Sequence, residues 1–261
     1  MFPILVKIGP VTIHTYGFMM ALGVGMGLWF IYAQAKKQGM EASRLIDMAF
    51  YTIIIALVGA KAVLLVGDLA YYFKNPAELL SLARSGGVFQ GGLAFGFIFA
   101  MWYLYKHRIP TWKAADIFAP ALALGHGFGR IGCFSAGCCY GHECAVPWGV
   151  TFNNEYAHSL TGIPLNTPLH PTQLYEAVLN FINFGILFYI LKKKKFDGQV
   201  FSLYIINYSV YRFVIEFFRY HPDKAYLFQN PSSLSLSQVF CIVGLIGGIA
   251  LLVIFKKRKR A

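Results

Sequence analysis

Two arginines in this sequence each lie four residues from another polar side chain, inside or at the edge of a long apolar run. Arg130 follows His126 and Arg212 precedes Glu216, so each pair shares one face of a helix. A charged side chain is costly in such a run and needs a partner. Because a guanidinium matches the oxygens of a phosphate as a bidentate fork, we expect both arginines to bind a phosphate group.

Neighbouring side chains extend this set. Tyr208 lies one turn before Arg212, Arg219 follows Glu216 by three residues, and Lys61 lies within another apolar run. Glu216 can neutralise one arginine but not both, which leaves a surplus of positive charge. Two interpretations stay open: an Arg212–Glu216 pair that only ties helices together, or an anionic ligand that balances the surplus.

Two histidines could exchange protons beside these arginines. His126 lies one turn from Arg130, on the same helical face. His170 lies just before a predicted helix. We expect Thr172 to cap the start of that helix, and we expect the negative charge of Glu176 to be stabilised by the positive end of the helix dipole. His170 could act as a base, donate to a phosphate, or be an ordinary loop residue.

Four of the five cysteines follow Arg130 within fifteen residues: Cys133, Cys138, Cys139 and Cys144. Their spacing contains no C-x2-C pair, so we predict no metal site. In an oxidising compartment they could form disulfides, more easily as Cys133–Cys138 or Cys139–Cys144 than between the adjacent pair. A nucleophilic thiol is a further alternative. We expect Cys241 to be an inert core residue.

The composition is that of an integral membrane protein. Of 261 residues, 57% are hydrophobic and 13% charged, whereas a soluble domain carries about 25% charged residues. The net charge of +12 lies mainly in loops between apolar runs, so we predict no nucleic-acid partner. Residues 1–10 show no basic region before an apolar core, and we expect the first span to direct insertion.

Seven apolar runs could each cross a bilayer, which takes about 20 residues. They predict an all-α, polytopic fold with seven transmembrane helices and a single domain over residues 1–261. The fourth run is short and is interrupted by glycines, which makes it the weakest of the seven signals for a span. The runs are 16–32, 48–66, 89–105, 114–128, 174–191, 200–218 and 239–255.

The loops indicate the orientation. Fifteen of the 23 lysines and arginines follow the first, third, fifth and seventh runs, on one side of the membrane. The positive-inside rule then places the N-terminus outside and the C-terminus in the cytoplasm. Segments 67–88, 129–173 and 219–238 lie on the outer side, where we expect the chemistry. A phosphate at that depth belongs to a phospholipid headgroup.

Glycines recur at the start of the third run, between Gly86 and Gly96. They allow close helix packing, or they expose backbone N–H groups to an anion. Several short motifs along most of the chain resemble, in order and spacing, those of the phosphatidylglycerol–prolipoprotein diacylglyceryl transferases. They are Thr15-Tyr16-Gly17, Gly59-Ala60-Lys61, Gln90-Gly91-Gly92-Leu93, Gly129-Arg130-Ile131-Gly132, His170-Pro171-Thr172-Gln173-Leu174-Tyr175-Glu176, and Tyr208 with Arg212-Phe213 and Glu216-Phe217-Phe218-Arg219.

The resemblance implies a multi-pass enzyme of the bacterial inner (cytoplasmic) membrane. It would move a diacylglyceryl group from phosphatidylglycerol to the lipobox cysteine of a prolipoprotein signal peptide and release glycerol phosphate, without a cofactor. Arg130 and Arg212 match the family's two essential arginines, and we expect catalysis by these two with His126 and His170. The substrate-binding residues would be Tyr16, Lys61, Gln90, Gly91, Gly92, Tyr208, Glu216 and Arg219.

The sequence departs from the family pattern at several of these positions. Gln90 stands where the family has a histidine that could activate the thiol, and a glutamine can position a group but cannot accept its proton. Lys61 replaces an arginine, and the family has asparagine, asparagine and glutamate at Cys133, Ala136 and Cys138. Two alternatives therefore stay open: a related lipid-headgroup transferase with another acceptor, and a membrane redox or metal protein that uses the cysteines.

Overall fold

The structure, a computed structural model, describes residues 2–75, 87–220 and 234–259. Gly86 and parts of two of the predicted outer segments lie outside these residues. The chain forms two compact units, one of residues 1–30 with 115–261 and one of residues 31–114. The single domain over residues 1–261 stays a prediction.

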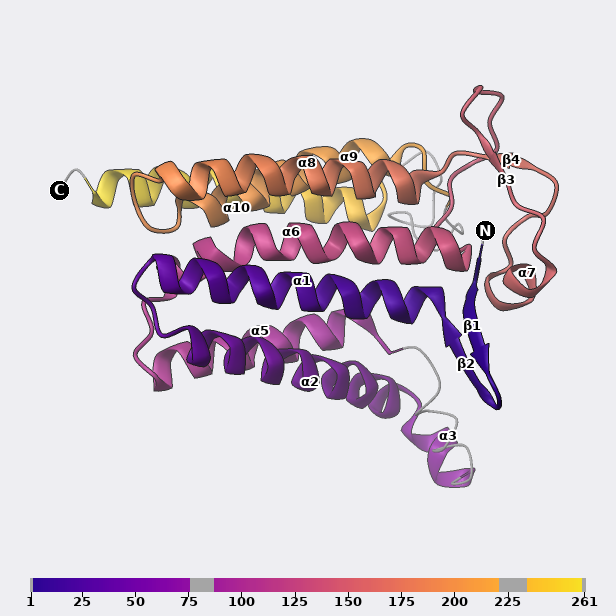
Figure 1. Ribbon diagram of the computed structural model, residues 1–261, viewed down its shortest axis with the longest axis horizontal. Helices are drawn as coiled ribbons and strands as arrows, with labels where there is room; N and C mark the ends of the chain where they lie inside the picture. The colour runs from indigo at the N-terminus through magenta and orange to yellow at the C-terminus, as the bar shows by residue number, and fades with distance from the viewer. Residues whose placement is uncertain (1, 76–86, 221–233, 260–261) are drawn as a thin grey trace. The chain divides into compact units, whose positions relative to one another are not determined.

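In the described part of the chain, seven helices of 18 residues or more coincide with the seven apolar runs. They are α1 (Thr15–Lys37), α2 (Ala42–Gly67), α5 (Phe89–Lys106), α6 (Thr111–Ala136), α8 (Thr172–Lys193), α9 (Gln199–Glu216) and α10 (Leu236–Arg258) (Figure 1). Five of these, all except α5 and α9, are long and apolar enough to cross a membrane. The chain is thus a mostly helical, multi-pass membrane protein, and the count of seven spans stays a prediction.

Short elements lie between the long helices. Strands β1 (Ile4–Ile8) and β2 (Val11–His14) form an antiparallel hairpin before α1, and β3 (Val150–Thr151) pairs with β4 (Pro168–Leu169). Two short helices are α3 (Leu69–Lys74) and α7 (Glu155–Thr161). The all-α prediction missed the strands because they are too short to form a periodic pattern of their own.

The unit of residues 31–114 contains a close packing of α2 against α5 that depends on glycine. A methyl group added at Gly59 would lie 2.5 Å from Cβ of Phe95, and one at Gly91 would lie 2.6 Å from Cγ2 of Val63. A side chain at Gly92 would press on the carbonyl of Ala56 at 3.0 Å. These contacts give the glycines a packing function; the binding of substrate by Gly91 and Gly92 stays a prediction.

In the larger unit, α6 runs without a break through its glycines to Ala136. The fourth run, the weakest of the seven signals, is thus one continuous helix, because its glycines provide room for neighbours instead of ending the helix. A methyl group at Gly23 of α1 would lie 3.0 Å from the carbonyl oxygen of Gly125, and one at Gly127 would lie 2.7 Å from the ring of Phe181. The glycines therefore bring α1 and α8 close to α6.

The helices α8, α9 and α10 lie side by side, with α9 in contact with both others (Figure 1). Asp116 of α6 is fully buried and connects this group to α6. Its carboxylate accepts hydrogen bonds from the backbone N–H groups of Gly198 (2.9 Å) and Phe201 (3.0 Å), at the start of α9. Nζ of Lys194 completes its surroundings at 3.0 Å. Lys194 is thus an ion-pair partner as well as part of the charge pattern that predicts orientation.

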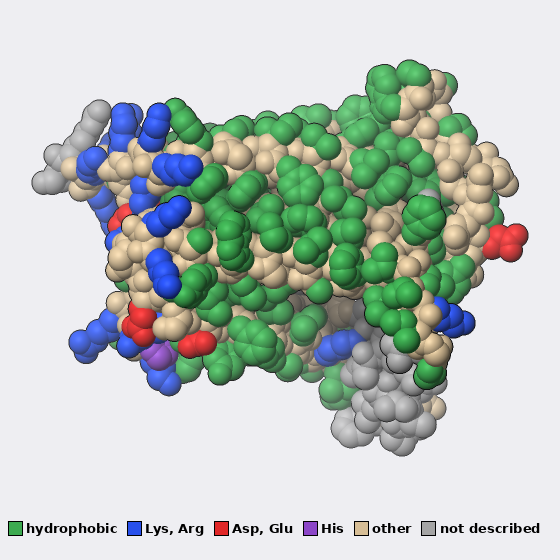
Figure 2. Space-filling view, viewed as in Figure 1, with side chains coloured by type: hydrophobic (Ala, Val, Ile, Leu, Met, Phe, Trp, Pro, Cys, Tyr) green, Lys and Arg blue, Asp and Glu red, His purple; other side chains and the backbone are tan. Residues whose placement is uncertain are grey.

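Figure 2 shows lysine and arginine side chains gathered where α8 and α10 end, while hydrophobic side chains cover the flanks of the helices. The last turns of these helices carry Lys192, Lys193, Lys256, Lys257 and Arg258. The basic ends agree with the pattern from which the cytoplasmic side was predicted. The direction in which the chain crosses the membrane stays a prediction.

Candidate active site

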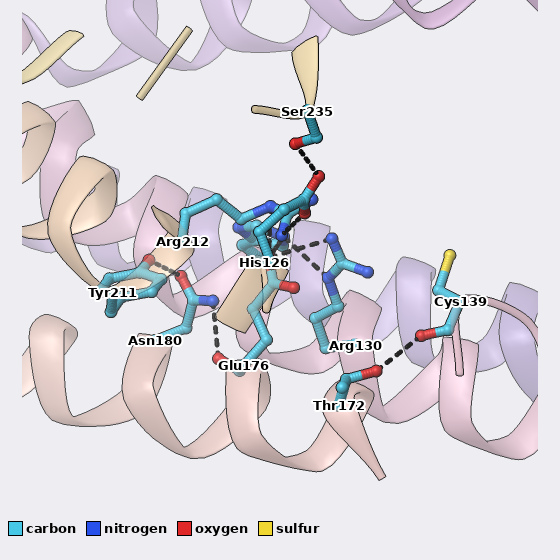
Figure 3. A network of polar contacts seen from close by, with 10 residues as sticks. His126, Arg130, Cys139, Thr172, Glu176, Asn180, Tyr211, Arg212 and Ser235 are labelled. Atoms are coloured by element: carbon cyan, nitrogen blue, oxygen red, sulfur yellow. Dashed lines mark hydrogen bonds and ion pairs between the residues drawn. The ribbon is translucent and has the colours of Figure 1, made fainter. Parts of the chain in front are cut away.

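A buried carboxylate lies at the centre of the polar side chains in the larger unit. Glu176, in the second turn of α8, is 1% exposed. Its Oε1 lies 3.0 Å from Nη2 of Arg130, 3.3 Å from Nε2 of His126 and 4.0 Å from Nε of Arg212 (Figure 3). Side chains from α6 and α9 therefore converge on a single oxygen atom from α8.

A second carboxylate completes the balance of charge. Oε2 of Glu216 lies 2.6 Å from Nη1 of Arg212, and its Oε1 accepts a hydrogen bond from the hydroxyl of Ser235 at 2.7 Å. Ser235 also forms a reciprocal capping box with Gln238 at the start of α10. The two arginines thus face two glutamates, and the expected surplus of positive charge at Arg130 and Arg212 is absent from these residues.

His126 has one ring nitrogen that faces two different groups. Nε of Arg130 donates to Nε2 of His126 at 3.2 Å, and that same nitrogen lies 3.3 Å from the carboxylate of Glu176. A nitrogen without a proton can accept from Arg130, whereas a protonated one must donate to Glu176 instead. Both states therefore have a partner in place, as a proton-transfer residue requires. The ring of Tyr208 lies 5.8 Å from the His126 ring.

The first turn of α8 is attached to the segment after α6. Thr172 was expected to cap α8, but its hydroxyl donates to the carbonyl of Cys139 at 2.9 Å, and Pro171 occupies the cap position. Nε2 of Gln173 donates to the carbonyl of Cys138 at 2.7 Å. Both donors are buried. The prediction of a Thr172 cap was wrong because a tertiary acceptor replaces the local backbone N–H.

The cysteines divide into a group of three and one that lies apart. All five are free thiols, and the sulfur atoms of Cys133, Cys138 and Cys139 lie within 4.8 Å of one another. The pKa of the Cys139 thiol is lowered, first by hydrogen bonds from Cys133 and Cys138 and then by the charge of Arg219. The pKa of Cys138 is raised, mainly because it donates to the other two sulfurs. The expected disulfides stay a prediction.

His170 makes its contacts away from Glu176. Its Nδ1 lies 3.2 Å from the hydroxyl of Tyr175, which accepts a hydrogen bond from the indole of Trp148 at 2.8 Å. Its ring packs against Phe218 at 5.2 Å. These surroundings are those of an aromatic loop cluster, which favours the interpretation of His170 as a loop residue over that of a base.

The remaining candidates lie in three places. Tyr16 is half-exposed on α1, and its ring would be 3.2 Å from a methyl group at Gly132. Arg219 follows the end of α9, and its backbone forms an isolated antiparallel β-bridge with that of Gly141. The buried Nε of its side chain has no hydrogen-bond acceptor among the described residues. Lys61 is half-buried in the unit of residues 31–114, together with the exposed Gln90 and the buried Gly91 and Gly92.

Sequence reasoning missed the central position of Glu176. Its placement in the first residues of α8 suggested only a favourable charge at a helix end, although its spacing of four from Thr172 put it one turn deeper. Asn180 was also missed: its amide donates to the backbone carbonyl of Glu176 and its carbonyl accepts from the hydroxyl of Tyr211, each at 2.8 Å. A polar side chain every four residues along α8 was the available signal.

Comparisons with known proteins converge on one family. A family model described as prolipoprotein diacylglyceryl transferase matches residues 3–254. A phosphatidylglycerol–prolipoprotein diacylglyceryl transferase of Clostridium tetani is 35% identical over 99% of both chains. Proteins of the same name from Finegoldia magna (31%, over 95% of this chain and 93% of the relative) and Pseudomonas paraeruginosa (32%, over 99% and 95%) are also similar.

Proposed function

The chain belongs to the prolipoprotein diacylglyceryl transferase family, and from this membership we propose how its own residues carry out the transfer. The enzyme transfers a diacylglyceryl group from phosphatidylglycerol to the lipobox cysteine thiol of prolipoproteins. We further propose that it does so in the bacterial inner membrane, with the N-terminus outside, and that it takes its acceptor cysteines from signal peptides.

Arg130 and Arg212 hold the phosphate of the lipid in this proposal. Arg130 uses Nη2 for its ion pair with Glu176 and Nε for its hydrogen bond to His126. In Figure 3 the third nitrogen of its guanidinium group points away from Glu176. Glu176 and Glu216 hold both guanidinium groups in place before the lipid arrives. Such prior orientation lowers the cost of reorganisation when negative charge grows on the departing phosphate.

His126 receives the proton of the acceptor thiol. A thiol is a poor nucleophile, and with an ordinary pKa of about 8.5 it is only a few per cent ionised at neutral pH. The unprotonated Nε2 of His126 is directed by Arg130, and after it takes a proton it can donate to Glu176. Gln90 cannot accept a proton, so its contribution is to position a substrate.

The chemical step then balances. The thiolate attacks the glyceryl carbon of the lipid that carries the phosphate oxygen. A carbon–sulfur bond forms, the carbon–oxygen bond breaks, and the bonding electron pair leaves on the phosphate oxygen as glycerol phosphate. Between substrate and product the phosphate gains negative charge, which Arg130 and Arg212 stabilise more strongly than in the starting lipid.

The convergence of two arginines from different helices on Glu176 is the observation that supports this assignment of roles. The test is thioether formation on a synthetic lipobox peptide with phosphatidylglycerol, followed by mass spectrometry. We expect Arg130→Ala to lower the rate by about 100-fold or more, as loss of a donor to a developing anion does elsewhere. Arg130→Lys should recover little, because a point charge does not replace a fork. An alanine variant with a near-normal rate would make Arg130 a structural residue.

A further inference from the structure

Three thiols of the larger unit lie close together at the end of α6 and just after it. The sulfur atoms of Cys133, Cys138 and Cys139 lie within 4.8 Å of one another. Sulfurs bound to one tetrahedral zinc ion at about 2.3 Å lie roughly 3.8 Å apart. The three sulfurs are therefore within about 1 Å of the spacing that a single metal ion requires.

The backbone of Cys138 and Cys139 is held in place by hydrogen bonds from another helix, α8. Buried Thr172 and Gln173 at the start of α8 donate to the carbonyls of Cys139 and Cys138. Cys139 has a φ of 61°, a left-handed conformation that is uncommon for a residue with a side chain and needs support from its surroundings. This conformation brings two cysteines that are adjacent in sequence to the same cluster as Cys133. A fixed arrangement of ligands is what distinguishes a metal site from a group of nearby thiols.

The charges around the cluster suit an anionic metal complex. Three thiolates and one divalent cation carry a net charge of −1. The positive charges of Arg219 and Arg130 both act on Cys139. Arg219 also contributes a buried Nε that has no acceptor among the described residues. Soft thiolate ligands select thiophilic ions such as Zn²⁺ over hard ions such as Mg²⁺.

We propose that Cys133, Cys138 and Cys139 bind a thiophilic divalent cation of the Zn²⁺ type, and that its open fourth position binds the acceptor thiol of the lipoprotein substrate. This inference rests on the transferase function. Three protein ligands with one open position are typical of catalytic zinc sites, whereas structural sites are closed by a fourth protein ligand. A thiol that coordinates such an ion loses its proton.

Gln90 stands where the family has a histidine that could activate the thiol. The three-cysteine metal site gives this chain another way to ionise the acceptor thiol. The acceptor S–H binds the cation, its proton passes to His126, and the metal-bound sulfur keeps the electron pair. That pair forms the bond to the glyceryl carbon while the phosphate oxygen departs with the electrons of the broken bond. The product thioether is a weaker ligand than the thiolate, so it can leave the metal.

The first measurement is metal binding by the full-length protein in detergent or nanodiscs. We expect one zinc ion per chain by elemental mass spectrometry, and sulfur-to-cobalt charge-transfer bands after exchange with Co²⁺. Cys133→Ser, Cys138→Ser and Cys139→Ser should each remove the metal and these bands. Cys144→Ser should leave the metal content unchanged, because Cys144 is not part of the three-sulfur cluster. Absence of any bound metal in the reduced wild-type protein would overturn the proposal, and so would a disulfide that resists reduction in native membranes.

The second measurement tests the open position. A lipobox peptide with a free cysteine should shift the ligand-field bands of the cobalt-loaded protein, and the same peptide with serine should not. A chelator should lower thioether formation by about 100-fold or more, the effect of losing a proton-removing group, and Zn²⁺ should restore it. If the peptide leaves the bands unchanged and the chelated enzyme keeps its rate, the cation does not bind the acceptor and the proposal fails.

These two measurements distinguish a failure of the proposed metal site from a failure of the proposed transfer reaction. Cys241→Ala, in the buried part of α10, serves as the control for loss of a thiol outside the cluster. If no preparation forms a thioether, with or without metal, the transfer reaction has failed, and the cobalt bands and their response to the cysteine peptide alone decide the metal site.

Discussion

The four charged side chains of the site neutralise one another, which lowers the free-energy cost of burying them. Arg130, Arg212, Glu176 and Glu216 form a group whose formal charges cancel, with ion-pair distances of 3.0 and 2.6 Å. Removing one partner from a buried pair usually costs about 3–5 kcal/mol because it leaves an unpaired charge. Each glutamate therefore affects both the fold and the position of an arginine that the lipid phosphate needs.

Glu176→Gln separates these two effects. The substitution keeps the shape of the side chain but leaves Arg130 and Arg212 with one carboxylate between them. We expect lower thermal stability in lipid-free detergent, and a larger recovery on addition of phosphatidylglycerol than the wild type shows, because a lipid phosphate can replace the missing charge. Glu155→Gln is the matched control, since Glu155 is an exposed residue at the start of α7. Equal stability of Glu176→Gln and wild type, with equal rates, would contradict the role of Glu176.

His126→Gln tests the proton acceptor. A glutamine cannot accept the thiol proton, so we expect the variant to form thioether about 100-fold more slowly than the wild type. His170→Gln should keep a near-normal rate, because His170 lies against Tyr175 and Phe218 instead. The measurement is the rate of thioether formation by the three proteins. A near-normal rate for His126→Gln would show that His126 does not receive the proton.

Packed helices explain how the site is positioned. α6 supplies His126 and Arg130, α8 supplies Glu176, and α9 supplies Arg212. Glycines on α6 and α10 let these helices approach closely, since an added methyl group would overlap a neighbour at several of them. The spacing of helices, and so of the charged groups, depends on residues with no side chain of their own.

Two adjacent glycines of α10 provide a direct comparison. A methyl group at Gly248 would lie 2.8 Å from Cγ1 of Ile206, whereas one at Gly247 meets nothing within 4 Å. Gly248→Ala should therefore destabilise the protein by about 1–3 kcal/mol through overpacking, while Gly247→Ala should be neutral or gain up to about 1 kcal/mol of helix propensity. Thermal unfolding in one detergent compares the two. A smaller loss at Gly248 than at Gly247 would show that α9 and α10 have room to separate.

At the scale of the whole molecule, the apolar runs predicted the seven long helices found in residues 2–75, 87–220 and 234–259. They could do so because the membrane imposes a length and a composition that are visible in sequence. The contacts between helices were harder to predict from the sequence. The pairing of Glu176 with Arg130 joins residues far apart in the chain, and nothing in the local pattern of α8 names its partner. The same holds for Thr172, whose acceptor is a carbonyl 33 residues earlier.

The orientation of the molecule is open to a simple test. The basic side chains at the ends of α8 and α10 predict that these ends are cytoplasmic. A reporter fused after Ala261 should be active only in its cytoplasmic form. A cysteine introduced by Asn153→Cys should react with a membrane-impermeant thiol label from outside the cell, beyond the labelling of the unsubstituted protein. An external score for the reporter after Ala261 would reverse the assigned topology and place the active site at the cytoplasmic face.

The burial of Asp116 has a consequence for the period in which the chain is being synthesised. Its carboxylate enters the membrane region with α6, but Phe201, which donates to it, is 85 residues further along the chain. At about 5–20 residues per second a ribosome needs roughly 4–17 s to reach that partner. For this interval the nascent chain holds the Asp116 carboxylate without all of its native donors. α6 therefore reaches its final surroundings only after the first turn of α9 has been synthesised.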